Sequence, residues 1–221
     1  MDQNTKKQRV AEAVLDYIDN GESLGIGSGS TVNILIENLS KVKNKIRNVV
    51  SSSLKSTELL EANGFEVSEL RDVGRLTKYI DGADEVNKDL QMIKGGGGAL
   101  TREKILAHNS NQFICIVDDS KKVDMLGKFP LPIEVIPLSR SSVSLELIKH
   151  GGRPVLRENF VSDNGNLILD IHNLQIMEPI KLEQAINNIP GVVTNGIFAL
   201  DHANVLLCAS DSGVDKTDLN A

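Results

Sequence analysis

Short apolar runs alternate with amphipathic stretches along the first half of the chain. Apolar side chains recur at helical spacing over residues 8–18 and 32–39, which predicts two helices. Further helices are expected over 56–63 and 100–108, and strands over 24–26, 49–52, 65–70, 79–81 and 113–117. This alternation of strands and helices is typical of a parallel sheet covered by helices.

The pattern changes near Gly127, and residues 129–132 are expected to form a linker. The segments expected next are a strand at 133–136, a helix at 142–150, a strand at 154–157, a hairpin at 160–171 that turns at Asn164-Gly165, a helix at 182–188 and a strand at 191–200. Their order is ferredoxin-like. A last strand at 203–209 is expected to return to the main sheet.

These elements predict an α/β fold in two parts. Residues 1–128 and 202–221 are expected to form a Rossmann-like catalytic domain, in which a mostly parallel sheet carries helices on both faces. Residues 129–201 are expected to form a smaller, ferredoxin-like α+β lobe. In open α/β sheets ligands bind at the carboxyl ends of the strands. The loops that follow the predicted strands are therefore where functional residues are sought.

Composition narrows the classes of function. The 221 residues carry a net charge of −6, with five Phe, two Tyr and no Trp. A general nucleic-acid or anionic-membrane surface is therefore disfavoured. Cys115 and Cys208 lie in apolar runs, so they are expected in the core rather than in a disulfide. We see no signal peptide or spanning segment and no metal-ligand spacing among the histidines, which favours a cytoplasmic, metal-free protein.

A glycine-rich loop lies between a predicted strand and a predicted helix. It reads Gly25-Ile-Gly-Ser-Gly-Ser-Thr31. Glycines let backbone N–H groups approach an anion, and the helix N-terminus favours negative charge. A tight turn with a serine N-cap explains the same residues equally well. The loop lacks the Lys of a Walker A motif, and the next strand ends without an acidic residue, so a dinucleotide site is disfavoured.

The densest chemistry lies between residues 81 and 103. Asp81-Gly82-Ala83-Asp84-Glu85 follows a predicted strand, where both aspartates can face a ligand crevice. A turn with solvated acids, or a metal site, would use the same residues. Lys94 then precedes four glycines, a combination of cation and bare backbone that suits an enediolate or a phosphate. A flexible loop is the alternative.

Glu103 falls on the apolar stripe of its predicted helix, together with Ala99, Leu100, Leu106 and Ala107. A carboxylate on that face is expected to have a raised pKa through desolvation, which suits a general base. An acid that complements the helix dipole would explain its presence but not its face. Lys121, at another strand end, is a candidate phosphate contact, although a solvated lysine is a similar alternative. Lys7 is a weaker candidate.

With these residues in hand, the chain resembles the ribose-5-phosphate isomerase A family along nearly its whole length. The matching motifs are those at 25–31, 80–85 and 94–104, together with Asp119-Ser-Lys121, 129–132, 162–166 and 188–193. The resemblance implies interconversion of ribose 5-phosphate and ribulose 5-phosphate in the pentose phosphate pathway, without a cofactor. It also implies a homodimer. The family often has Thr where this chain has Ser28.

The resemblance also implies roles for residues of this chain. Glu103 is expected to be the base that moves a proton between C2 and C1. Asp81 and Lys94 are expected to handle charge and protons on the two substrate oxygens, and Asp84 to assist ring opening. The expected substrate-binding residues are Ser28, Gly29, Ser30, Thr31, Asp81, Gly82, Ala83, Asp84, Lys94, Gly95, Gly96, Gly97, Lys121 and Lys7. No metal ligand is expected.

Two other functions fit parts of this pattern. An amino-sugar-phosphate deaminase would share the architecture, but no motif here specifically points to it. A non-catalytic sugar-phosphate sensor would keep the phosphate loop but would not need Glu103 on an apolar stripe. It would usually carry a DNA-binding segment, for which the short N-terminal stretch leaves little room.

Overall fold

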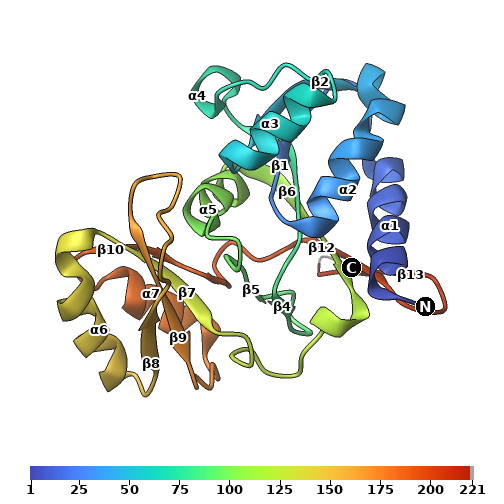
Figure 1. Ribbon diagram of the computed structural model, residues 1–221. Coiled ribbons are helices and arrows are strands. Elements are labelled where there is room, and N and C mark those ends of the chain that lie inside the picture. The colour runs from blue at the N-terminus through green and yellow to red at the C-terminus, as the bar shows by residue number, and fades with distance from the viewer. Residues whose placement is uncertain (220–221) are drawn as a thin grey trace. The chain divides into compact units, whose positions relative to one another are not determined.

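A computed structural model describes residues 1–219 (Figure 1). The chain divides into two compact units. Unit 1 comprises Met1–Ala83, Arg102–Lys121 and the chain from Ala203 onward, and unit 2 comprises Asp84–Thr101 and Lys122–His202. The domain boundaries placed after residues 128 and 201 stay a prediction. Within residues 1–219, no helix has both the length and the apolar character needed to cross a bilayer.

Unit 1 is built on a six-stranded sheet in the order β13-β12-β6-β3-β1-β2. The strands are β1 (Glu22–Ile26), β2 (Ile46–Ser51), β3 (Leu76–Asp81), β6 (Ser110–Asp118), β12 (Val205–Ala209) and β13 (Val214–Asp218). All neighbours pair in parallel except β13, which runs antiparallel to β12. The parallel strands follow the doubly wound order 2-1-3-4-5, whose switch point lies between β1 and β3. The mostly parallel sheet and the return of the chain through β12 are confirmed.

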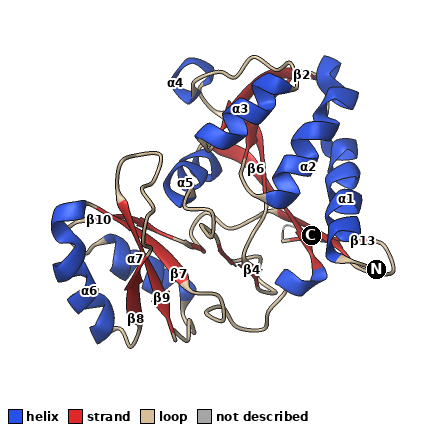
Figure 2. Ribbon diagram, in the orientation of Figure 1, coloured by secondary structure: helices blue, strands red, loops and turns tan. Residues whose placement is uncertain are grey.

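Helices cover both faces of this sheet, as expected (Figure 2). They are α1 (Gln3–Ala13), α2 (Ser30–Asn38), α3 (Leu54–Ala62), α4 (Leu70–Val73) and α5 (Leu100–His108), with 3-10 turns at Val14–Tyr17, Leu39–Lys45 and Asp119–Lys121. Helices α1 and α2 share a core with Leu24, Ile26 and Ile80 of the sheet. Helix α5 packs on the other face, because a Cβ on Gly25 would meet Leu106 of α5 as well as Tyr79.

Three parts of unit 1 differ from the sequence-based expectation. The strand expected at 65–70 is reduced to one bridge between Val67 and Val49 at the sheet edge, and Leu70 already begins α4. Helix α1 begins at Gln3, where Asp2 accepts a hydrogen bond from the Thr5 N–H, so its polar first turns escaped the apolar pattern. Strand β13 was not expected, because its side chains are almost all outside the core.

Unit 2 contains a four-stranded antiparallel sheet in the order β10-β7-β9-β8. Its elements are β7 (Leu131–Val135), a 3-10 turn at Pro137–Ser139, α6 (Arg140–Lys149), β8 (Arg153–Leu156), β9 (Leu167–His172), α7 (Pro179–Asn187) and β10 (Val192–Asn195). In chain order the sheet reads 4-1-3-2. That is the arrangement of two interleaved β-α-β units, and it matches the ferredoxin-like expectation.

Unit 2 also departs from the expectation in detail. Part of the expected linker, Leu131 and Pro132, belongs to β7, and residues 160–162 form no strand. Strand β9 pairs with β8 instead, so residues 157–166 form the connection of this hairpin. The expected strand at 191–200 is split into β10 and β11 (Ile197–Phe198). Strand β11 joins β5 (Met92–Ile93) and β4 (Glu85–Val86), which are too short to show a period.

Helix α3 offers a matched test of the core of unit 1. Leu60 is fully buried, whereas Leu54 on the same helix is 54% exposed. Replacing Leu60 by Ala leaves a cavity and should lower the free energy of unfolding by about 2–5 kcal/mol. Replacing Leu54 by Ala should change it by about 0.5 kcal/mol or less. Urea unfolding of both variants measures the difference, and equal costs would contradict this placement of α3.

Candidate functional site

The carboxyl ends of β1 and β3 meet at the switch point of the unit 1 sheet. The Gly27 N–H donates to the Ile80 carbonyl at 2.9 Å, which keeps the segment just past β1 against the end of β3. A Cβ on Gly27 would overlap the carboxylate of Asp81. Gly27 is therefore required for close approach, and Asp81 occupies the space that a side chain at position 27 would take.

Asp81 is fully buried, and its carboxylate is held by several donors. Oδ1 accepts from the Ser28 N–H at 3.0 Å and from the Gly82 N–H at 2.7 Å, and Oδ2 accepts from the Tyr79 hydroxyl. Burial raises the pKa of Tyr79 well above its usual value, and the charges of Asp81 and Glu103 raise it further. The phenol therefore stays a proton donor to Asp81.

Glu103 lies on α5 and is 3% exposed, which confirms that it faces inward. Its Oε1 accepts from the Ser28 hydroxyl at 2.6 Å. Ser28 thus connects two buried carboxylates, through its N–H to Asp81 and through its hydroxyl to Glu103. A carboxylate held in this way is oriented for proton transfer.

The N-terminus of α2 begins directly after this loop. Gly29, the N-cap, has φ of 100° and no side chain with which to cap the helix. The first N–H groups of a helix have no partner within it, so this end favours an anion. Lys7 reaches the same point, because its Nζ donates to the Ser30 hydroxyl at 2.9 Å. Lys7, the weakest candidate from the sequence, thus contacts the glycine-rich loop at Ser30, the residue before Thr31.

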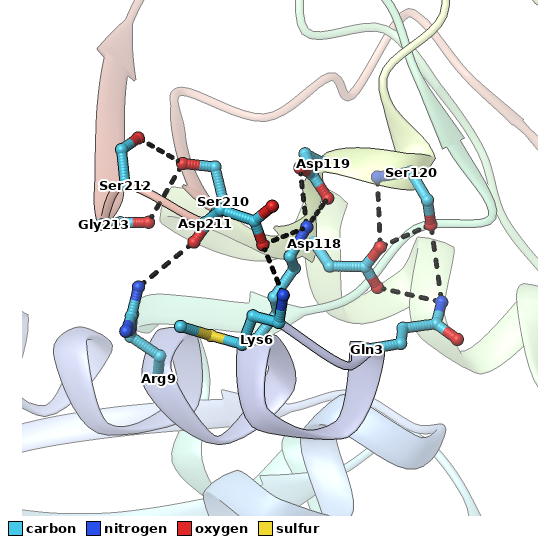
Figure 3. Close-up of polar contacts among 11 residues, drawn as sticks. Gln3, Lys6, Arg9, Asp118, Asp119, Ser120, Ser210, Asp211, Ser212 and Gly213 are labelled. Carbon is cyan, nitrogen blue, oxygen red and sulfur yellow. Dashed lines mark hydrogen bonds and ion pairs between the residues drawn. The ribbon is translucent and has the colours of Figure 1, made fainter.

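Lys121 ends the 3-10 turn that follows β6, and this turn is bound to the first turns of α1 (Figure 3). Gln3 donates to Asp118 at 3.2 Å, and Lys6 forms an ion pair with Asp119 at 2.9 Å. Helix α1 also carries Lys7. Lys7 and Lys121, both predicted to bind substrate, therefore lie on segments that are joined by hydrogen bonds and an ion pair, which the sequence did not reveal.

Two further contacts extend this network to the turn between β12 and β13 (Figure 3). Lys6 also pairs with Asp211 at 3.1 Å, and Arg9 donates to the Ser210 carbonyl at 3.1 Å. Burial alone would raise the pKa of Asp118, but hydrogen bonds from Ser120 and Gln3 outweigh it and lower that pKa. Asp118 therefore stays charged and holds the start of the turn.

Unit 2 contributes Asp84 and the glycine run. Asp84 Oδ2 accepts from the Gly96 N–H at 2.8 Å, and a Cβ on Gly96 would lie 2.7 Å from Oδ1. Lys94 is 3% exposed, and its Nζ lies 5.4 Å from the centre of the Phe198 ring. Its N–H donates to the Gly196 carbonyl at 2.9 Å, so the backbone just before β11 fixes the start of the run.

The glycine run forms a tight turn. The Gly98 N–H donates to the Gly95 carbonyl at 2.8 Å, and both glycines have positive φ, 98° at Gly95 and 82° at Gly98. The ends of the turn are buried, whereas Gly96 and Gly97 between them are exposed. The turn therefore presents bare backbone at its tip, held by buried ends.

The structure brings some of the predicted site residues into contact with one another. Unit 1 brings together Ser28, Asp81 and Glu103, and separately Lys7 and Ser30. Gly82 and Ala83 continue from Asp81 and are half-buried. Unit 2 joins Asp84 to Gly96. Within residues 1–219, no group of three or more His, Cys, Asp or Glu has the arrangement of a metal site.

Sequence reasoning missed two residues beside these groups. Tyr79 was taken only as part of an apolar strand, although its hydroxyl bonds to Asp81. Its position two residues before Asp81, on the same face of β3, was the available signal. Arg157 was placed at the end of a strand, although its guanidinium donates to the Gly96 carbonyl at 3.1 Å. No local pattern marks that contact.

The chain matches known proteins over nearly all its length. Residues 48–213 match the family described as ribose 5-phosphate isomerase A (phosphoriboisomerase A). The chain is 51% identical to ribose-5-phosphate isomerase A of Buchnera aphidicola subsp. Acyrthosiphon pisum (strain Tuc7), over 97% of this chain and 96% of that protein.

Solved structures agree with this match. The crystal structure of ribose 5-phosphate isomerase A from Neisseria gonorrhoeae is similar with a TM-score of 0.96 and 47% identity, over 98% of this chain and 97% of that chain. A D-ribose-5-phosphate isomerase solved in complex with phospho-erythronic acid is similar with a TM-score of 0.95 and 35% identity, over 99% and 100%.

The raised pKa of Tyr79 has a consequence for stability in alkali. The unfolded chain releases the phenolic proton at a pH of about 10, whereas the folded chain retains it. Stability from this group is thus present below pH 10 and is lost above it, by about 1.4 kcal/mol per pH unit. Unfolding free energies measured between roughly pH 9 and 11 should fall more steeply with pH for the parent than for Tyr79→Phe. Parallel curves would contradict the assignment.

Proposed function

The chain belongs to the ribose-5-phosphate isomerase A family, and we propose that it interconverts D-ribose 5-phosphate and D-ribulose 5-phosphate. The observation that carries the proposal is the buried carboxylate of Glu103, oriented by Ser28 beside Asp81 at the switch point of the sheet. Moving a proton between two adjacent carbons needs one carboxylate of this kind. It needs no redox cofactor.

In the proposed mechanism Glu103 takes a proton from C2 of the open-chain aldose. An enediolate forms, and the same carboxyl group returns the proton to C1, so one residue serves as base and then as acid. The hydrogen bond from Ser28 keeps one oxygen of Glu103 in place while the other handles the proton. Reversal of these steps gives the opposite reaction.

Charge on the two substrate oxygens has to be balanced as the enediolate forms. The proposal assigns this role to Lys94 and to Asp81, together with the transfer of the hydroxyl proton from O2 to O1 that completes the isomerisation, and it assigns ring opening to Asp84. In the glycine run the Gly96 N–H is bound to Asp84, and the N–H groups of Gly95 and Gly97 add oriented dipoles of the kind that stabilise a developing oxyanion. A lysine and fixed N–H groups supply what a metal ion would otherwise supply.

The phosphate is assigned to the N-terminus of α2. Residues 28–31 offer backbone N–H groups and hydroxyls, and Lys7 lies within hydrogen-bond distance of Ser30. Lys121, on the turn tied to α1, is the second proposed cation. The bound phospho-erythronic acid of the 35% identical isomerase supports a sugar-phosphate ligand, because that molecule is itself a phosphorylated sugar acid.

The remaining features of the proposal follow from the family. We propose that the enzyme acts in the pentose phosphate pathway, as a homodimer in the cytoplasm, without cofactor, metal, nucleic acid or membrane. The net charge of −6 supports the last two points, because a phosphodiester or an anionic bilayer would be repelled. The substrate anion is attracted locally by Lys7 and Lys121.

Glu103→Gln tests the base directly. The amide cannot accept the C2 proton, so kcat for ketose formation from ribose 5-phosphate should fall by about 10²- to 10⁴-fold. Glu58→Gln is the matched control, because Glu58 is an exposed carboxylate on α3, and it should keep the parent rate. Each assay is run with and without a chelator. Parent-like turnover by Glu103→Gln would exclude Glu103 as the base, and a chelator-sensitive parent would exclude metal-free catalysis.

Ser28 allows a finer test, since its hydroxyl donates to Glu103 at 2.6 Å. Ser28→Thr keeps a hydroxyl and should retain kcat within about threefold, whereas Ser28→Ala removes a hydrogen bond to a charged group and should lower kcat by about 10- to 100-fold. Thermal unfolding establishes that both variants are folded. Equal rates for the two variants would show that the hydroxyl does not orient the base.

A further inference from the structure

Arg157 of unit 2 contacts the backbone of the glycine run directly. Nη1 donates to the Gly96 carbonyl at 3.1 Å and lies 3.4 Å from the Gly95 carbonyl, which Nη2 also approaches at 3.5 Å. These are carbonyls of the exposed tip and of the residue before it. A guanidinium that binds two successive carbonyls constrains the orientation of both peptide planes.

The guanidinium is itself held in place. Its Nε and Nη2 donate to the two oxygens of Asp170 at 2.8 Å and 2.6 Å, and both side chains are 19% exposed. The strand ladder fixes this pair, because Val155 of β8 faces Asp170 of β9 and the Arg157 N–H donates to the Ile168 carbonyl. A two-point pair between Asp170 on β9 and Arg157 just past β8 leaves the guanidinium little freedom to turn.

Aromatic packing completes the arrangement. The Arg157 guanidinium lies 5.2 Å from the centre of the Phe160 ring. The same ring packs against Gly98, where a Cβ would overlap it. The connection that carries Phe160 is anchored in turn by the buried Glu134, which accepts from Ser162 at 2.8 Å and from Asn166 at 2.8 Å.

Because the peptide bond is planar, the contacts that Arg157 makes with the two carbonyls also determine where the following N–H groups point. In a trans peptide the C=O and the following N–H point to opposite sides. Arg157 holds the Gly95 carbonyl, and the Gly96 N–H of that peptide donates to Asp84 on the other side at 2.8 Å. Arg157 also holds the Gly96 carbonyl, so the Gly97 N–H points away from Arg157, as the Gly96 N–H does.

We propose that Arg157 is a positioning residue that aims the N–H of Gly97 at the substrate oxygen on which enediolate charge develops. Asp170 fixes the guanidinium, the guanidinium fixes the peptide between Gly96 and Gly97, and its charge polarises that peptide so that the N–H becomes a better donor. The inference rests on the proposed isomerase function. It deepens that function by adding a residue that does not touch the substrate.

A half-buried ion pair that serves only to stabilise the hairpin is the competing explanation for Arg157 and Asp170. The two explanations differ in kinetics. Loss of a purely structural pair lowers the amount of folded protein without changing the active molecules. Loss of an aimed donor lowers kcat in folded enzyme and leaves KM largely unchanged, because the donor acts on charge that exists only near the transition state.

The experiment compares Arg157→Lys with Arg153→Lys. Arg153 is exposed at the start of β8, the strand that ends just before Arg157, which makes it a matched control. A lysine at 157 cannot bind Asp170 at two points and two carbonyls together. Arg157→Lys should lower kcat for ribose 5-phosphate by about 10- to 100-fold, with KM changed less than about threefold. Arg153→Lys should match the parent in both constants.

Two further measurements separate the outcomes. Phospho-erythronic acid carries a planar carboxylate, so its inhibition constant should rise about 10-fold in Arg157→Lys, whereas that of inorganic phosphate should not change. In Arg157→Ala, added guanidinium ion should restore part of kcat, and it should not do so in Arg153→Ala. Thermal unfolding reports whether each variant is folded.

The results distinguish failure of this inference from failure of the proposed function. A parent enzyme without isomerase activity would overturn the function itself. An active parent with an unchanged kcat and an unchanged phospho-erythronic acid constant in folded Arg157→Lys would overturn the role of Arg157 and leave the function intact. If Arg157→Lys does not fold, guanidinium rescue of Arg157→Ala decides, and a lack of rescue in folded Arg157→Ala overturns the inference.

Discussion

The site in unit 1 depends on the fit of the Asp81 carboxylate into the space beside Gly27. Because position 27 has no Cβ, the carboxylate lies between the ends of β1 and β3 and accepts from the Ser28 N–H. That hydrogen bond fixes the backbone at Ser28, whose hydroxyl then reaches Glu103. The Tyr79 hydroxyl donates to the same Asp81 carboxylate, and its raised pKa keeps the phenolic proton on Tyr79. The absence of a Cβ at position 27 therefore determines where the carboxylates of both Asp81 and Glu103 are held.

Buried carboxylates also hold parts of unit 2 together, although the proposed mechanism gives them no role in the reaction. Glu134 accepts from three side chains of the 157–166 connection and from the Thr101 hydroxyl at the start of α5. Glu85 accepts from the N–H groups of Gly127 and Phe129, and Glu183 from those of Ala199 and Leu200. A buried charge is tolerated when hydrogen bonds replace its water. These three glutamates hold irregular segments whose backbone is not paired in a β-sheet.

Sequence reasoning succeeded where the signal was local. The inward face of Glu103 follows from helical phase, and the strand-end position of Asp81 follows from an apolar run that stops there. It failed where a contact joins residues far apart in the chain. The fit of Asp81 against Gly27 spans more than fifty positions, roughly as far as Arg157 lies from Gly96, and neither pair leaves a periodic trace. The short strands β4, β5 and β11 were missed because two residues show no period.

The glycine run is where the structure changes the interpretation most. A run of glycines suggests flexibility, yet other side chains closely approach Gly95, Gly96 and Gly98. A Cβ on Gly95 would lie 2.8 Å from Leu100, one on Gly96 would lie 2.7 Å from Asp84, and one on Gly98 would overlap Phe160. Glycine loses more conformational entropy on ordering than any other residue, so a packed run is costly unless close approach repays it. The close approach here brings side chains against the turn from both sides, Asp84 on one and Arg157 on the other, and the peptide planes between them are thereby set before any ligand arrives.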